Sequence, residues 1–200
     1  LSKDEGVLNS IIKQEDLHKK IASVIFDKAE ALVTKEERAL AKAVDFAYLY
    51  GAGDTTLQKI ILENWSEAEI SATRVKTAIQ TVFTKVDSTI KGVEERGYIE
   101  LIDKTRIPLE YIPKKHTYFN RMVQGSGAII LKKVVSEIVK QLPEGASICF
   151  LLHDELMIEA PTHLTQVCVR IVTKTMTEVL YGYGYNIDLP ISIEIKRGGE

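Results

Sequence analysis

The sequence predicts an α/β (α+β) protein: a largely helical layer followed by a part built on a small antiparallel sheet that helices flank. Most of the first 140 residues have the periodicity of helices, whereas two short apolar runs near residue 150 flank a turn. The 200 residues are 45% hydrophobic and 27% charged, an ordinary globular composition. The chain is therefore long enough for one domain, or for two small ones that share a core.

Two helices are expected near the N-terminus. Apolar residues at helical spacing predict the first over residues 16–26. Thr34 and Glu37 have the form of a capping box, which predicts a second helix from there towards Tyr50. Gly51 ends it, because glycine adopts the left-handed conformation that closes helices.

The middle of the chain is expected to hold one long helix and then irregular structure. Ser66 to Glu69 resemble a second capping box, which predicts a helix from there into the region of Glu94. Gly97 ends it, and residues 98–112 are expected to form short extended pieces and turns.

The C-terminal part changes character after a helix expected over residues 119–141. Residues 148–152 and 156–160 are apolar runs that predict a hairpin, and because both faces are apolar we expect it to be central in a sheet. Another helix is expected over residues 161–181, and residues 189–196 alternate like a strand.

Composition limits where the protein works and what it binds. The 26 basic and 28 acidic residues give a net charge of −2, so any contact with nucleic acid must come from local basic patches. Cys149 and Cys168 are too few for a disulfide scaffold or a cysteine-built zinc site. No signal segment or uncharged stretch of membrane-spanning length is present, so we expect an intracellular protein that is not secreted and has no membrane partner.

Cations and aromatic residues share one face of the helix predicted to end near Tyr50. Arg38, Lys42, Phe46 and Tyr50 follow one another at intervals of four, and each such step rotates only about 40° around a helix. The series spans about 18 Å. A nucleoside triphosphate has the matching polarity, with phosphates at one end and a flat base at the other. The alternative is an amphipathic helix with solvated cations and core aromatics.

Carboxylates lie at the predicted tip of the C-terminal hairpin. Two-residue hairpin turns favour glycine, but the tip formed by His153, Asp154 and Glu155 contains none. Carboxylate oxygens at the mouth of a sheet suit Mg²⁺, although a solvated acidic loop is the alternative.

Four segments, taken together, resemble motifs of the family A DNA polymerases, the bacterial DNA polymerase I family. Residues 38–51 resemble the fingers-helix motif and residues 152–156 the palm motif, while 119–125 and 16–18 resemble the start of the palm helix and a segment ahead of the fingers helix. The order is that of the family and covers nearly the whole chain. The resemblance implies three parts: a palm remnant (1–15), fingers (16–115) and the C-terminal palm (116–200).

The resemblance also implies roles for individual residues. The incoming dNTP would be bound by His18, Arg38, Lys42, Phe46 and Tyr50. Primer-template DNA would be contacted by Tyr50, Arg121, Gln124 and His153. The catalytic residues would be Lys42, Asp154 and Glu155, with Asp154 as a ligand of two Mg²⁺ ions.

The implied activity is template-directed DNA synthesis, with nucleotidyl transfer from a dNTP to a primer 3′-hydroxyl by a two-metal mechanism. The family's other catalytic aspartate lies on a strand before the segment that Leu1 to Glu5 resemble. We therefore expect the chain to be a fragment or a split subunit that lacks this aspartate, and an upstream polypeptide to supply that palm strand and the thumb. Asp45 stands where the family commonly has asparagine. Two alternatives remain: a non-catalytic DNA-binding or assembly module, and a related single-subunit RNA polymerase.

Overall fold

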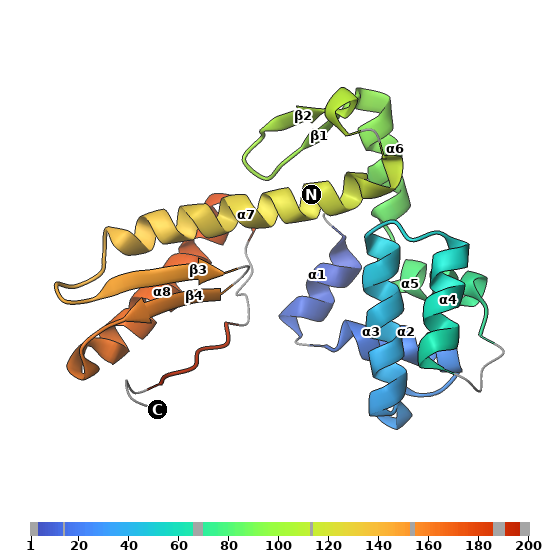
Figure 1. Cartoon of the computed structure of the whole chain (residues 1–200), viewed down its shortest axis with the longest axis horizontal. Coiled ribbons are helices and arrows are strands. Elements are labelled where there is room, and N and C mark those ends of the chain that lie inside the picture. The colour runs from blue at the N-terminus through green and yellow to red at the C-terminus, as the bar shows by residue number, and fades with distance from the viewer. Residues whose placement is uncertain are drawn as a thin grey trace. The chain divides into compact units, whose positions relative to one another are not determined.

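The computed structural model describes residues 4–13, 15–65, 70–112, 114–152, 155–185 and 191–196 (Figure 1). The chain divides into two compact units, residues 1–125 and 126–200, and helix α7 (Tyr118–Val139) begins in the first and continues in the second. The combination of many helices with small antiparallel sheets confirms the predicted fold class. None of the described helices has both the length and the apolar character of a membrane span.

The first unit is built mainly of helices, four of which share an apolar core. In chain order these are α1 (Glu5–Ile12), α2 (Leu17–Phe26), α3 (Lys35–Leu49), α4 (Asp54–Asn64), α5 (Ala72–Val82) and α6 (Val86–Arg96). The main core cluster takes fully buried side chains from four of them, among them Ile21 of α2, Leu40 of α3, Leu57 of α4 and Val75 of α5. The core therefore fixes α2 and α3 against α4 and α5.

Helices α2 and α3 confirm the two N-terminal predictions. The α3 capping box is complete: Glu37 N donates to Thr34 Oγ1 (3.2 Å) and Thr34 N donates to Glu37 Oε2 (2.9 Å). Glu37 is buried and also accepts from Lys28 Nζ at 2.6 Å. Tyr50 caps the C-terminal end of α3, and Gly51 follows with φ +88°.

The single long helix predicted for the middle of the chain is wrong. Helix α5 begins at Ala72 after its N-cap Ser71, and it is separate from α6; residues 66–69 lie outside the described part. At the junction, Asp4 accepts hydrogen bonds from Thr84 Oγ1 and Lys85 N, both at 3.1 Å. Helical periodicity gives no sign of such a contact between residues that are distant in the sequence.

Helix α4 is a further element that the sequence analysis did not predict.

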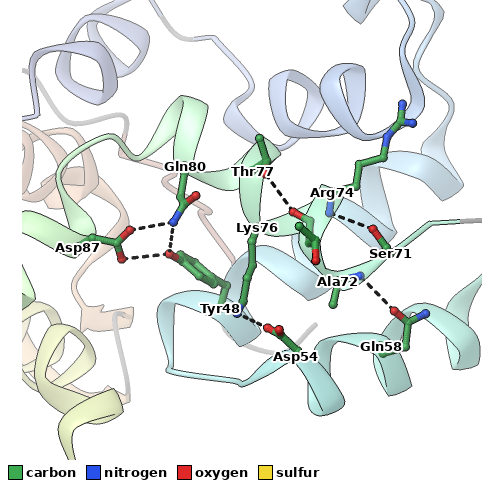
Figure 2. Close-up of polar contacts among 11 residues, drawn as sticks. Tyr48, Asp54, Gln58, Ser71, Ala72, Arg74, Lys76, Thr77, Gln80 and Asp87 are labelled. Atoms are coloured by element: carbon green, nitrogen blue, oxygen red, sulfur yellow. Dashed lines mark hydrogen bonds and ion pairs between the residues drawn. The ribbon is translucent and has the colours of Figure 1, made fainter.

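Polar contacts join four of these helices (Figure 2). Tyr48 Oη on α3 donates to Asp87 Oδ1 on α6 (3.2 Å), and Gln80 Nε2 on α5 lies 2.8 Å from Asp87 Oδ2 and 3.2 Å from Tyr48 Oη. Gln58 Oε1 on α4 accepts from Ala72 N at the start of α5 (3.0 Å). Because hydrogen bonds require a defined geometry, these contacts restrain the relative orientation of the helices, which apolar packing alone does not specify.

A short hairpin follows α6 in the first unit and confirms the extended pieces predicted within residues 98–112. Strands β1 (Tyr98–Glu100) and β2 (Arg106–Pro108) pair antiparallel. Leu101, just after β1, lies against α7 at Gly125, where an added Cβ would be 3.0 Å from Leu101 Cδ2. The small residue therefore lets the hairpin approach this helix closely.

The second unit contains the predicted helix-flanked hairpin. Strand β3 (Ser147–Leu152) pairs antiparallel with β4 (Glu155–Glu159), and α8 (Thr165–Gly182) follows the 3-10 turn η4 (Thr162–Leu164). One face of the hairpin packs on α7 and α8. The side chains in this core include Ile148, Leu156, Ile158, Val134, Ile138 and Val179.

Two expectations for this unit are not met in the described residues. The β3–β4 sheet has two strands there, and its other side is open: Phe150 is 44% and Met157 47% exposed. The expectation of a hairpin central in a sheet is therefore wrong for this part of the chain. Residues 191–196, the described part of the last predicted strand, have no strand pairing, and Ile193 and Ile195 are exposed. Alternation shows which side of a strand is apolar, but pairing requires a neighbouring edge.

Candidate functional site

Five of the predicted site residues lie on the packed helices α2 and α3. His18 is in the first turn of α2, Arg38, Lys42 and Phe46 are on α3, and Tyr50 caps α3. The site is built on two helices that the core holds together, which fixes the spacing of these side chains.

The aromatic residues form a connected, partly open series. The rings of Phe46 and Tyr50 stack at 6.1 Å with an interplanar angle of 15°, and the His18 ring meets Phe46 edge-on at 5.6 Å. Lys42 Nζ lies 5.8 Å from the centre of the Phe46 ring. Phe46 is 41% and Tyr50 47% exposed, so ring surface remains for a flat ligand.

The cationic end of this surface is held in place by Asp16. Arg38 Nε donates to Asp16 Oδ2 at 2.6 Å, while Asp16 Oδ1 caps α2 by accepting from the backbone N–H of His18 and of Lys19, both at 3.1 Å. Partial burial acts to raise the pKa of Asp16, but the bonds from Arg38 and Lys19 lower it on balance. Lys42 is exposed and has no carboxylate partner among the described residues. An anion reaching this surface would meet one fixed cation and one unpaired cation.

Asp45 is a further polar residue of this site. In the sequence, Asp45 differs from the asparagine that the family commonly has at this position. Its side chain is 1% exposed, and its Oδ2 lies 3.3 Å from His18 Nδ1. Asp45 lies four residues after the buried Ala41 and next to the buried Val44. An acidic residue on the apolar face of a predicted helix is therefore the sequence feature that could have identified Asp45 as part of the site.

The end of α3 meets the segment that leads into α7. Gln124 Nε2 donates to Tyr50 Oη at 3.2 Å, which brings together two residues predicted to contact DNA. At Gly51 an added Cβ would lie 2.2 Å from the backbone O of His116, in the 3-10 turn η3 (Lys115–Thr117). Arg121 is exposed on α7, one turn before Gln124.

The predicted metal-binding residues are described only in part. Glu155 opens β4 opposite Leu152, and its side chain is exposed; His153 and Asp154 lie outside the described residues. An exposed carboxylate next to Asp154 in sequence is a hard oxygen donor of the kind that Mg²⁺ takes. Within the described ranges, no group of three or more His, Cys, Asp or Glu side chains is placed to hold a metal. Asp4 is committed to Thr84 and Lys85.

Comparisons of the sequence with known proteins agree with one another. A sequence profile of DNA polymerase family A matches residues 1–200. The chain is 27% identical over 213 residues to DNA polymerase I of Bacillus subtilis (strain 168), covering 99% of this chain and 23% of that protein. It is 26% identical over 211 residues to the thermostable DNA polymerase I of Thermus aquaticus, covering 99% of this chain and 24% of that protein. The chain thus spans about a quarter of the length of these relatives.

A comparison of structures supports the same fold. The POL domain of Pol1 from M. smegmatis, solved in complex with DNA primer-template and dNTP, superimposes with a TM-score of 0.75 and 22% sequence identity. The match covers 96% of this chain and 35% of that one. With the sequence profile matching along its whole length, the chain belongs to DNA polymerase family A.

Proposed function

We propose that the chain takes part in template-directed DNA synthesis, the transfer of a nucleotidyl group from a dNTP to a primer 3′-hydroxyl. The observation that carries this proposal is the continuous surface formed by His18, Arg38, Lys42, Phe46, Tyr50 and Gln124. Membership of DNA polymerase family A supports it. The solved relative of the same fold is a complex with primer-template and dNTP, which supports both ligands.

The cations would act on the triphosphate. Negative charge builds up on the attacking and leaving oxygens during nucleotidyl transfer, and a preorganised cation stabilises charge that develops in the transition state. Lys42 is the described cation best suited to this, because it is exposed and unpaired. Arg38 is oriented in advance by Asp16, so it binds phosphate at little cost in side-chain order.

The aromatic residues would position the base and the primer-template end. Phe46 offers the ring surface next to Lys42, and Tyr50 lies one helical turn further along α3. Gln124, bonded to Tyr50, and the exposed Arg121 would contact the DNA from α7, together with His153. The order from cations to aromatics matches the order from phosphate to base.

Two Mg²⁺ ions would be held by Asp154, with Glu155 nearby, and when bound they would stabilise charge on the reacting oxygens. The proposal includes an upstream polypeptide that carries a further palm strand, its aspartate and the thumb. Two observations support such a partner: this chain matches about a quarter of its relatives' length, and the β3–β4 hairpin has an open apolar side. Its place of action would be inside the cell, where DNA and dNTPs are found.

A primer-extension assay tests this function. The chain alone should extend a primer poorly, and adding a polypeptide with the palm strand and thumb should restore extension. Asp154→Asn should abolish the restored activity without unfolding the protein, because the change removes charge and keeps volume. Robust extension by the chain alone, or activity of the Asp154→Asn variant within a few-fold of the parent, would contradict these assignments.

A matched pair of lysine variants tests the nucleotide surface. Lys42→Ala should reduce dNTP use at least tenfold while leaving primer-template affinity within a few-fold. Lys59→Ala is the control, because Lys59 is also an exposed helical lysine of the first unit but pairs with Glu63 on α4. Equal effects of the two variants would remove Lys42 from the phosphate site. Binding of DNA without dNTP use would favour the non-catalytic module, and a preference for rNTPs would favour the RNA polymerase.

A further inference from the structure

The buried carboxylate of Asp45 lies next to His18, the histidine of the nucleotide surface. Asp45 Oδ2 is 3.3 Å from His18 Nδ1, and the two side chains are 1% and 20% exposed. Neither His18 Nδ1 nor Asp45 Oδ1 has a hydrogen-bond partner in the described part of the chain. The pair is close enough to interact, although its geometry is not that of a hydrogen bond.

A carboxylate determines which nitrogen of the imidazole carries hydrogen. An ionised carboxylate only accepts hydrogen bonds, so favourable contact with Asp45 requires a hydrogen on His18 Nδ1. The other ring nitrogen, Nε2, then remains for a ligand. In the neutral ring that nitrogen holds a lone pair, which phosphate oxygens repel; in the protonated ring it holds an N–H, which donates to them.

The charged groups linked to His18 through its neighbours include Arg38 and Lys42, the two cations of the proposed nucleotide surface. Asp16, at the cap of α2, interacts electrostatically with His18 but is also bonded to Arg38, and Lys42 of α3 lies over Phe46, the ring that His18 contacts. Helix α5 and the 3-10 turn η1 (Glu30–Leu32) also pack against α2. Their charged residues are Arg74, Lys76 and Glu30; Lys76 pairs with Asp54.

We propose that Asp45 is a positioning residue that makes triphosphate binding at His18 depend on proton uptake. When a dNTP binds, His18 Nε2 takes a proton from solvent and donates the new N–H to a phosphate oxygen, while Nδ1–H is held by Asp45. One N–H bond forms, the buffer loses the proton, and no electrons change hands. The inference rests on the proposed nucleotide surface and adds a property that this surface alone does not imply.

The substitution Asp45→Asn separates this role from simple packing. An asparagine has almost the same shape, but its amide can donate to Nδ1. The neutral imidazole can then carry its hydrogen on Nε2 and bind phosphate without gaining a proton. The variant should therefore keep nucleotide binding but lose most of its proton uptake. The dissociation constant of the variant for dNTP should change less between pH 7 and pH 9 than that of the parent. The dissociation constant of the parent should rise by up to about tenfold per pH unit once the proton must come from solvent.

Titration calorimetry of the full chain with Mg²⁺–dTTP tests the proposal. The heat of binding is measured at pH 8.0 in buffers of different ionisation enthalpy, and its dependence on the buffer gives the protons taken up per nucleotide. Proton uptake by the His18→Gln variant measures the contribution of the nucleotide itself. The difference in proton uptake between the parent and this variant is therefore the contribution of His18. The parent should take up a fraction of a proton more than His18→Gln, and Asp45→Asn should resemble His18→Gln in this respect.

The outcomes separate the two proposals. Absence of Mg²⁺–dTTP binding to the parent would overturn the nucleotide surface and this inference with it. Binding with equal proton uptake in the parent and His18→Gln would overturn the inference alone. If Asp45→Asn does not fold, the comparison of the parent with His18→Gln still decides, because it does not use that variant. Proton uptake by Asp45→Asn equal to that of the parent would show that Asp45 has no such role.

Discussion

Replacing Gly51 by alanine should destabilise the first unit more than any loss of a surface contact could. Gly51 has φ +88°, a conformation that costs other residues about 1–2 kcal/mol. The added Cβ would also lie 2.2 Å from His116 O and 2.6 Å from His116 Cβ. The nearest atom is backbone, so no side-chain rotation relieves the overlap. Overpacking of this kind costs about 1–3 kcal/mol. The two contributions together predict a loss of about 2–5 kcal/mol in the free energy of unfolding.

Gly97→Ala is the matched control. Gly97 also follows a helix with positive φ (+77°), but no atom lies within 4 Å of its added Cβ. That variant should lose about 1–2 kcal/mol, so the difference between the two variants measures the close approach to His116.

Trp65 provides the assay. It is the single tryptophan of the chain and packs on Phe26 in the core of the first unit, with ring centres 4.9 Å apart. Its fluorescence during urea unfolding therefore reports on this unit. Equal losses for Gly51→Ala and Gly97→Ala would refute the contact between the end of α3 and η3, and with it the placement of Tyr50 beside Gln124.

Two other variants test the capping box and the aromatic surface. Burial acts to raise the pKa of Glu37, but the Lys28 ion pair and the Thr34 N–H lower it on balance below its ordinary value of 4.5. The stability from this group is therefore present above about pH 4.5 and is lost as the pH falls through the folded-state pKa. Urea midpoints at pH 7 and pH 3 should differ less for Glu37→Gln than for the parent, and an unchanged difference would contradict this assignment. The family resemblance implies that Phe46→Tyr should increase dideoxynucleotide use in the reconstituted enzyme, because the added hydroxyl replaces the bond of the missing 3′-hydroxyl. Equal use of dideoxynucleotides by both proteins in a competition assay would count against the role of Phe46.

Local signals in the sequence were sufficient for α2, α3 and the C-terminal hairpin. The capping box at Thr34 and the glycine after Tyr50 act within a few residues, so they can be recognised without the fold. The four-residue spacing also placed Arg38 to Tyr50 on one surface. The break between α5 and α6 could not be predicted this way, because Asp4, which bonds to it, lies 80 residues earlier in the chain.

The same limit applies within the site. Helical spacing shows which residues of α3 share a face, but not which residue of α2 lies opposite. The contacts of Asp16 with Arg38 and of Asp45 with His18 depend on the packing of the two helices, and they became visible only in three dimensions. The open side of β3 and β4 has a similar cause, since an apolar strand pattern does not say which segment covers it.

The hydrogen bonds among Tyr48, Gln80 and Asp87 have a mechanical consequence. They tie α3 to α5 and α6, and the apolar core ties α3 to α2 and α4. A tilt of α3 alone would break buried packing and several directional bonds at once, which is far costlier than turning a few backbone torsions at the end of an element. Any motion that carries Arg38 and Lys42 towards a ligand must therefore move these helices together as one rigid body. The hinge of such a motion must lie in the segments that connect the helices to the rest of the chain, and not within the helices.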